Sequence, residues 1–123
     1  QECRRVINPD GRMCFTVIRL ADRLKGTAME RAVQAGPEFI HSETHYPSML
    51  RSAGWQIIQQ DDITGSFCAS IERMIAAEEN QSETLRALRG NEANETAQAN
   101  WRYKLQAVAD GLILREFFSV VPA

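Results

Sequence analysis

The sequence has little net charge of either sign and no long hydrophobic run. Its 123 residues contain 14 Lys and Arg against 16 Asp and Glu, a formal net charge of −2. The basic residues are spread along the chain and form no stripe that would follow a phosphate backbone. No apolar stretch reaches the roughly 20 residues that a membrane-spanning helix requires. We therefore expect a cytoplasmic protein with neither nucleic acid nor membrane as a partner.

Cysteine is also scarce. Cys3, Cys14 and Cys68 are odd in number and include no C-x-x-C pair. Two of them lie among apolar residues, where cysteine usually behaves as a small buried side chain. This usage predicts reduced thiols, as in a cytoplasm.

The glycine pattern G-x-G-x-G is missing from the sequence. Gly11 and Gly65 stand alone, as turn glycines do, and isolated glycines are weak signals for phosphate binding. We expect no cofactor-binding residue in this chain.

The sequence does contain an alternation of strand and helix patterns, which is typical of an α/β fold. With 44% hydrophobic residues, its length suits one core, so a single domain over residues 1–123 is expected. Strands are predicted over residues 13–18, 55–60 and 112–121. Besides a short opening helix, about five helices are predicted, with helical patterns over residues 28–35, 47–53, 67–79, 82–90 and 97–111.

The first strand, from Met13 to Ile18, has β-branched and aromatic residues and almost no polar alternation. This pattern indicates a strand covered on both faces inside a sheet. The preceding residues Asn8-Pro9-Asp10-Gly11 predict a tight turn.

Three segments of the sequence resemble a known family. The run R-V-I-N-P-D-G-R-M-C-F-T-V-I is similar to a segment of class I S-adenosylmethionine-dependent methyltransferases, in which a helix ending R-V-L-x-P-G-G leads into the fifth strand; Asp10 stands in place of the first glycine. The run Y-P-S-M-L-R-S-A-G-W-Q-I-I-Q-Q-D-D-I-T resembles the helix that ends in A-G-F or A-G-W before the sixth strand. The closing W-R-Y-K-L-Q-A-V-A-D-G-L-I-L-R-E-F-F-S-V-V-P-A resembles the final helix and seventh strand.

The resemblance covers the whole chain and implies a C-terminal half. It implies a partial Rossmann-like methyltransferase sheet of three mixed strands, which correspond to family strands five, seven and six. Four strands and the glycine-rich loop that binds S-adenosylmethionine would belong to the preceding half. The chain is then a methyltransferase-like fragment that carries the acceptor side and is inactive alone. Two alternatives remain: a small-molecule methyltransferase when completed by that half, and a non-catalytic dimeric binding module.

By the same resemblance, five residues are placed where they can cover the acceptor, whereas no catalytic residue is assigned. The residue types also fit ordinary packing, which is favoured for Phe67 and evenly balanced for Arg19. The substrate-binding candidates are Arg19, His41, His45, Tyr46 and Phe67.

His41 and His45 also raise the question of a metal site. A four-residue spacing brings two imidazoles together only on a helix, and Pro47 disfavours a helix through them. No third ligand is evident nearby, so no metal is predicted. A base in the pocket is the better hypothesis, because histidine titrates near neutral pH.

Two charged pairs invite a functional interpretation. Asp61 and Asp62 are adjacent on a strand and point to opposite faces, so we expect them to close the strand and favour the next helix. Arg115 and Glu116 interrupt an apolar strand, which indicates either a sheet edge or pairing across strands.

A half sheet leaves the strand from Met13 to Ile18 with one open, apolar edge. Such an edge is a template for another strand. We therefore expect a homodimer or a strand-exchanged dimer through this strand, or a complementary N-terminal half as partner.

Overall fold

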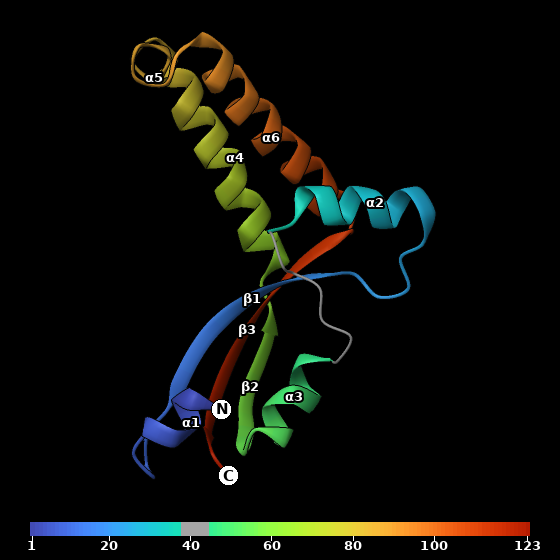
Figure 1. Cartoon of the computed structure of the whole chain (residues 1–123), viewed down its shortest axis with the longest axis vertical. Helices are drawn as coiled ribbons and strands as arrows, with labels where there is room; N and C mark the ends of the chain where they lie inside the picture. The colour runs from blue at the N-terminus through green and yellow to red at the C-terminus, as the bar shows by residue number, and fades with distance from the viewer. Residues whose placement is uncertain (38–44) are drawn as a thin grey trace.

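The structure, a computed structural model, describes residues 1–37 and 45–123. Within these residues it contains six helices and three strands (Figure 1). In chain order they are α1 (Glu2–Val6), β1 (Met13–Leu20), α2 (Gly26–Ala35), α3 (Tyr46–Ser52), β2 (Trp55–Asp62), α4 (Thr64–Asn80), α5 (Ser82–Arg89), α6 (Asn91–Ala109) and β3 (Ile113–Pro122). The predicted α/β class is confirmed, and the six helices are the opening helix and the five predicted after it.

The strands form one sheet in the order β1-β3-β2. β3 is antiparallel to both neighbours, so β1 and β2 run parallel to each other on either side of it. This is the order expected for strands five, seven and six. β1 pairs with β3 without interruption from Met13 to Leu20, whereas the β2 ladder shifts at a bulge between Ile57 and Gln59.

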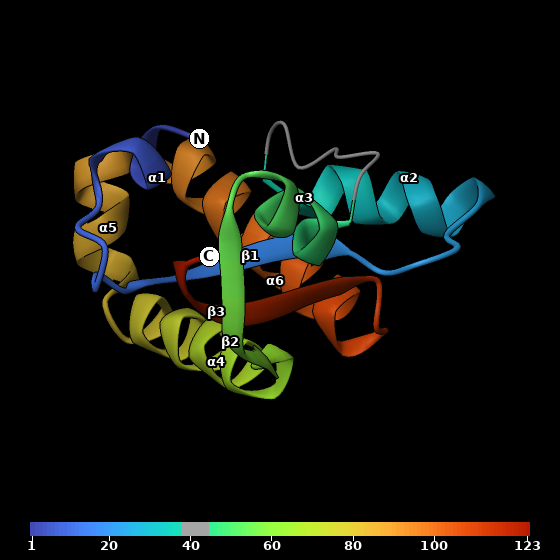
Figure 2. The same ribbon diagram turned by 90° about the horizontal axis from the view of Figure 1, so that it is seen from below.

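The core consists of two clusters at opposite ends of the sheet. α4 and α6 extend away from one end, while α1, α3 and both termini lie towards the other (Figure 1). Seen from below, β2 crosses β1 and β3 at a steep angle, as expected for a strongly twisted sheet (Figure 2). The larger cluster includes Ala32, Ile71, Val108 and Ile113, and the smaller one includes Leu50, Trp55, Phe118 and Val120.

The prediction that β1 is covered on both faces is wrong for its first half. Cys14 and Thr16 are exposed, while Phe15 and Val17, which alternate with them along the strand, are half-buried. Among the described residues, Ile18 and Leu20 are the apolar β1 side chains that pack against the larger cluster. Near its start, therefore, β1 has cover on one face alone.

The cysteines are also less buried than expected. Cys3 and Cys14 are exposed, and Cys68 is only half-buried. Cys14 lies on the uncovered face of β1, so its apolar sequence neighbours point to the other side. None of the three forms a disulfide bond in this structure.

The last helix begins earlier than its apolar pattern indicated. α6 starts at Asn91, directly after Gly90, whereas the pattern predicted a start at Ala97. Gly90 has a φ of 87°, which suits the sharp break from α5. Within the two described segments, no helix is long and apolar enough to span a bilayer.

Candidate functional site

The candidate site lies where the carboxyl ends of β1 and β2 flank the amino end of β3. Arg19 is the next-to-last residue of β1, and Asp62 is the last residue of β2. Glu116, on the central strand, is directly opposite Asp62. Ligands of open α/β sheets bind outside the carboxyl ends of strands, so this end of the sheet is where a binding site is expected.

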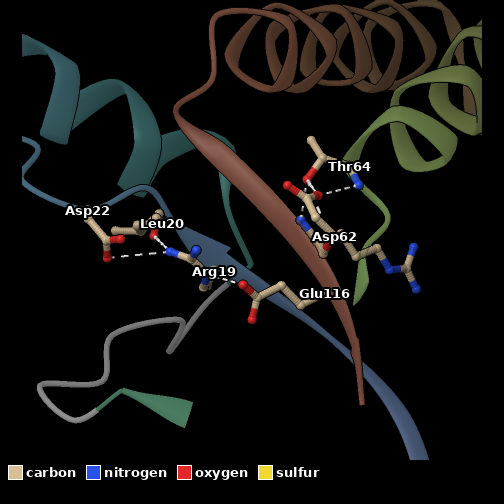
Figure 3. Close-up of polar contacts among 7 residues, drawn as sticks. Arg19, Leu20, Asp22, Asp62, Thr64 and Glu116 are labelled. Atoms are coloured by element: carbon tan, nitrogen blue, oxygen red, sulfur yellow. Dashed lines mark hydrogen bonds and ion pairs between the residues drawn. The ribbon is translucent and has the colours of Figure 1, made fainter. Parts of the chain in front are cut away.

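An ion pair joins β1 to the central strand at this end of the sheet (Figure 3). Arg19 Nε donates to Glu116 Oε1 at 3.0 Å, and the two side chains are only 19% and 10% exposed. Arg19 Nη1 also donates to the carbonyl oxygen of Leu20 at 3.2 Å and contacts Asp22 Oδ1 at 3.5 Å. The guanidinium is therefore fixed in position by three acceptors.

Asp62 is oriented by the start of α4. Its Oδ1 accepts hydrogen bonds from Thr64 Oγ1 at 2.5 Å and from the Thr64 amide at 2.9 Å (Figure 3). These hydrogen bonds are the main cause that holds the pKa of Asp62 below its ordinary value, and the charge of Arg19 adds to them. Asp62 is therefore a carboxylate at neutral pH, and the expected role of closing the strand and favouring the next helix is confirmed.

Glu116 has one oxygen that lacks a donor. Among the described residues, Oε2 is buried and accepts no hydrogen bond, whereas Oε1 is held by Arg19. A buried acceptor without a partner carries the full cost of losing water, and the cost is larger for a charged group. Glu116 therefore has unused capacity to accept a hydrogen bond.

The second interpretation of the Arg115 and Glu116 pair, pairing across strands, is confirmed. Both residues lie on the central strand, and Glu116 pairs with Arg19 on β1. Arg115 donates from Nη2 to Thr16 Oγ1 at 3.0 Å. Neither charge lies at a sheet edge.

Tyr46 faces the same side of the sheet as the ion pair. Its ring centroid is 6.3 Å from that of Phe118, which is two residues beyond Glu116 on β3 and so points to the same face. His45 precedes α3 as its N-cap residue and is exposed. His41 lies outside the described residues. The structure thus brings Arg19 and Tyr46 to one face of the central strand.

Phe67 lies on the other side of that strand. Its ring is 8% exposed within the larger core cluster, and the Arg115 guanidinium lies 5.0 Å from the ring centroid. Arg115 and its neighbour Glu116 point to opposite faces. The packing interpretation of Phe67 accounts for this position, and a role in substrate binding stays a prediction.

Sequence reasoning missed Glu116 and Asp62 as members of a site. It interpreted both as structural charges. One signal was present, because burying a carboxylate in an apolar central strand costs free energy unless a partner compensates the charge. The two residues occupy opposite positions in the strand register because of the bulge in β2, which no sequence pattern revealed.

A separate apolar cavity of about 210 Å³ lies at the other end of the sheet. It opens between α1, the start of β1 and α3, and its lining includes Cys3, Met13, Phe15, Tyr46 and Trp55. Tyr46 therefore links this cavity to the face that carries the ion pair. In the described part of the chain, no three His, Cys, Asp or Glu side chains gather as metal ligands would.

No protein-family model matches the sequence, and no curated protein is significantly similar to it. Solved structures do match the fold. A phosphoethanolamine N-methyltransferase 2 from Haemonchus contortus, in complex with phosphomonomethylethanolamine and S-adenosylhomocysteine, superposes with a TM-score of 0.83 at 19% identity. The match covers 98% of this chain and 28% of that one.

Two further structures agree. A protein described as a sarcosine dimethylglycine methyltransferase from Galdieria sulphuraria gives a TM-score of 0.78 at 14% identity, covering 98% of this chain and 44% of that one. The cyclopropane synthase MmaA2 from Mycobacterium tuberculosis gives 0.80 at 11% identity, covering 97% and 47%.

At these identities the likeness concerns the fold, and the chain spans less than half the length of each of these three structures. The chain therefore has the fold of part of a class I S-adenosylmethionine-dependent methyltransferase, consistent with a C-terminal half.

Proposed function

We propose that this chain is the acceptor-side half of an S-adenosylmethionine-dependent methyltransferase domain and transfers no methyl group alone. The proposal rests on one observation: the matched structures cover nearly all of this chain, but this chain covers less than half of each of them. The first three structures match at least 97% of this chain, yet the chain accounts for at most 47% of any of them. A methyltransferase of ordinary length would supply the other half.

The residues present do not fit the cofactor. The sequence has no G-x-G-x-G with which to cradle the nucleotide part. A Cβ atom at Gly11 would lie 2.5 Å from Ile7 Cγ1, so the space beside this glycine is already filled by the chain. Gly65 lies in the first turn of α4, with open space beside it. The cofactor S-adenosylmethionine is therefore assigned to the complementary half.

The role of this chain is to hold the methyl acceptor. In methyl transfer, positioning the acceptor nucleophile in line with the methyl group supplies much of the catalysis. The carboxylates of Glu116 and Asp62, at the end of the sheet, and Tyr46 on the same face are suited to orient a small molecule. They would lie where the two halves meet.

The experiment is calorimetry with S-adenosylmethionine on the chain 1–123 and on the complete product of its gene. We expect micromolar binding by a product that includes the glycine-rich half and none by the chain 1–123. The chain's fold is checked in the same samples by circular dichroism, so that lack of binding is not a result of unfolding. Micromolar binding by the chain 1–123 itself would contradict the proposal.

A second candidate, a non-catalytic module that dimerises, is favoured by the outer edge of β1. Among the described residues, β1 pairs only with β3, and it contains neither proline nor bulge. Two copies joined through this edge would form a continuous sheet of six strands. Light scattering tests this candidate: a monodisperse monomer across a wide concentration range would exclude it.

A further inference from the structure

We propose that the apolar cavity between α1, the start of β1 and α3 binds a small, uncharged aromatic molecule. Its lining includes the first residues of β1 and β2, so it lies at the opposite end of the sheet from Arg19 and Asp62. The inference does not depend on the proposed function. It is carried by three observations: the composition of the cavity wall, the volume of the cavity, and the way in which this chain encloses it.

The cavity wall is rich in aromatic and sulfur-containing side chains. The sequence has 16 such residues among 123 (3 Cys, 4 Met, 5 Phe, 2 Trp and 2 Tyr), but they make up six of the nine described residues that line the cavity. Aromatic rings attract another ring in offset or edge-to-face contact, and thioether sulfurs make favourable contacts with ring edges. The wall therefore favours an aromatic ligand over a saturated one of the same size. The six residues are Cys3, Met13, Phe15, Tyr46, Met49 and Trp55.

The wall also favours a ligand without charge. None of the nine lining side chains is charged. An ionised group placed among them would lose its hydration without gaining a charged partner, which costs several kcal/mol or moves its pKa until it is neutral. Gln1 and Tyr46 supply polar atoms to the wall, so one hydroxyl group on the ligand is compatible with it.

The volume limits the size of the ligand. The cavity measures about 210 Å³. In another protein an apolar cavity of about 150 Å³ binds benzene, whereas pockets for drug-sized ligands measure roughly 300 to 1,000 Å³. The ligand class is therefore a molecule of one or two rings.

The cavity is enclosed by four elements of this chain. Cys3 belongs to α1, Phe15 to β1, Leu50 to α3 and Trp55 to β2, and the last two are buried. A strand added at the outer edge of β1 would lie beside β1 in the plane of the sheet, whereas α1 and α3 stand over one face of it. Continuation of the sheet would therefore leave room in the cavity for a separate occupant.

The test uses the four methionine methyl groups of the chain as reporters. Met13 and Met49 line the cavity, whereas Met29 on α2 and Met74 on α4 do not. The chain, labelled with carbon-13 at these methyl groups, is titrated with phenol and separately with cyclohexanol, and nuclear magnetic resonance follows the signals. The two probes share ring size and hydroxyl group and differ in aromaticity. Each signal is assigned from a variant that lacks that methionine.

We expect phenol to shift the signals of Met13 and Met49 and to leave those of Met29 and Met74 in place. Phenol should bind about fivefold more tightly than cyclohexanol, which corresponds to the effect of one aromatic pair.

Two phenylalanine substitutions separate this cavity from other surfaces. Ala53→Phe adds a ring to the cavity wall and should weaken phenol binding at least tenfold. Ala87→Phe adds the same ring to an exposed position on α5, outside the lining, and should change phenol binding less than twofold. If Ala53→Phe fails to fold by circular dichroism, Cys3→Phe replaces it, because it adds a ring to the same wall from α1.

Unchanged Met13 and Met49 signals would overturn the inference. So would equal shifts of all four methionines, equal affinities for the two probes, or phenol binding that the substitution in the wall leaves intact. Shifts of both Met13 and Met49 that follow protein concentration without phenol would assign the cavity to a second copy of the chain. A complete gene product that ignores phenol would assign it to another segment of the same protein.

Either of these last two results would also overturn the inference. None of them bears on the calorimetry with S-adenosylmethionine. A complete gene product that binds the cofactor while the cavity ignores phenol would therefore retain the proposed function and remove only this site.

Discussion

The two edges of the sheet are built differently. β2 has Gln59, Gln60, Asp61 and Asp62 in its second half, all exposed, and a bulge interrupts its ladder. β1 has the sequence MCFTVIRL and pairs along its full length without a bulge. Charges and bulges are the devices by which proteins protect an edge from further pairing. The outer edge of β2 therefore carries features that oppose further pairing, whereas the outer edge of β1 has no bulge or proline, in line with the proposal that another strand continues it.

The largest expected effect comes from the strand that both edges share. Phe118 is fully buried, and its ring stacks on Phe15 of β1 with centroids 5.5 Å apart. On the β2 side its register partner is Gln60, which is exposed. Phe118→Ala should therefore lower the free energy of unfolding by about 4 kcal/mol. Urea denaturation measures it, with Gln60→Ala as a control that should change little.

Removal of the cation at the end of β1 should have the next largest effect. Arg19→Met keeps the length of the side chain but leaves Glu116 buried without its partner. The loss of one member of a mostly buried pair costs roughly 3 kcal/mol of unfolding free energy. The double variant Arg19→Met with Glu116→Gln should recover part of this loss. A single variant as stable as the parent protein would contradict the role given to the ion pair.

A lysine placed on each outer strand in turn tests the difference between the two edges directly. Cys14 and Gln56 are both the second residue of their strand, and both are exposed. Cys14→Lys should weaken any association through β1 at least tenfold, because a lysine on an edge strand opposes further pairing. Gln56→Lys should leave association unchanged. Analytical ultracentrifugation compares the two, and equal effects would remove the distinction between the edges.

The smallest expected effect is electrostatic and belongs to the β2 edge. Because the pKa of Asp62 is lowered in the folded chain, its ionised form stabilises the fold above pH 3.8, the ordinary value for aspartate, and this stabilisation is lost as the pH falls through the lower folded pKa. Thr64→Val removes the hydroxyl donor and should raise the Asp62 pKa towards its ordinary value. Thr64→Ser should keep it low. A carboxyl-carbon titration by nuclear magnetic resonance provides the measurement.

Much of the fold could be predicted from the sequence. The strand and helix patterns indicated every element, because apolar periodicity and turn residues such as Gly90 are local signals. The burial of β1 could not be predicted. An apolar strand has the same sequence pattern whether the side chains that pack on its faces belong to the same chain or to another one. Cys14 illustrates this point: its apolar neighbours predicted burial, and the structure exposes it.

The site was only partly predictable. Arg19 and Tyr46 were named from a family resemblance, and the structure places both on one face of β3. Glu116 and Asp62 occupy opposite positions because two segments more than fifty residues apart pair in a register that a bulge adjusts. Such long-range register is a property of the whole sheet and is not encoded in a local pattern.

Hydrogen exchange of the backbone amides on the two edges tests the central claim most directly. In the dilute chain 1–123, the outward amides of β1 should exchange about as fast as those of β2. In the complete gene product, or at concentrations where the chain associates, the β1 amides should become protected while the outward amides of β2 stay fast. Fast exchange at β1 under all of these conditions, or equal protection of both edges, would contradict the claim that β1 is made to be continued by another strand.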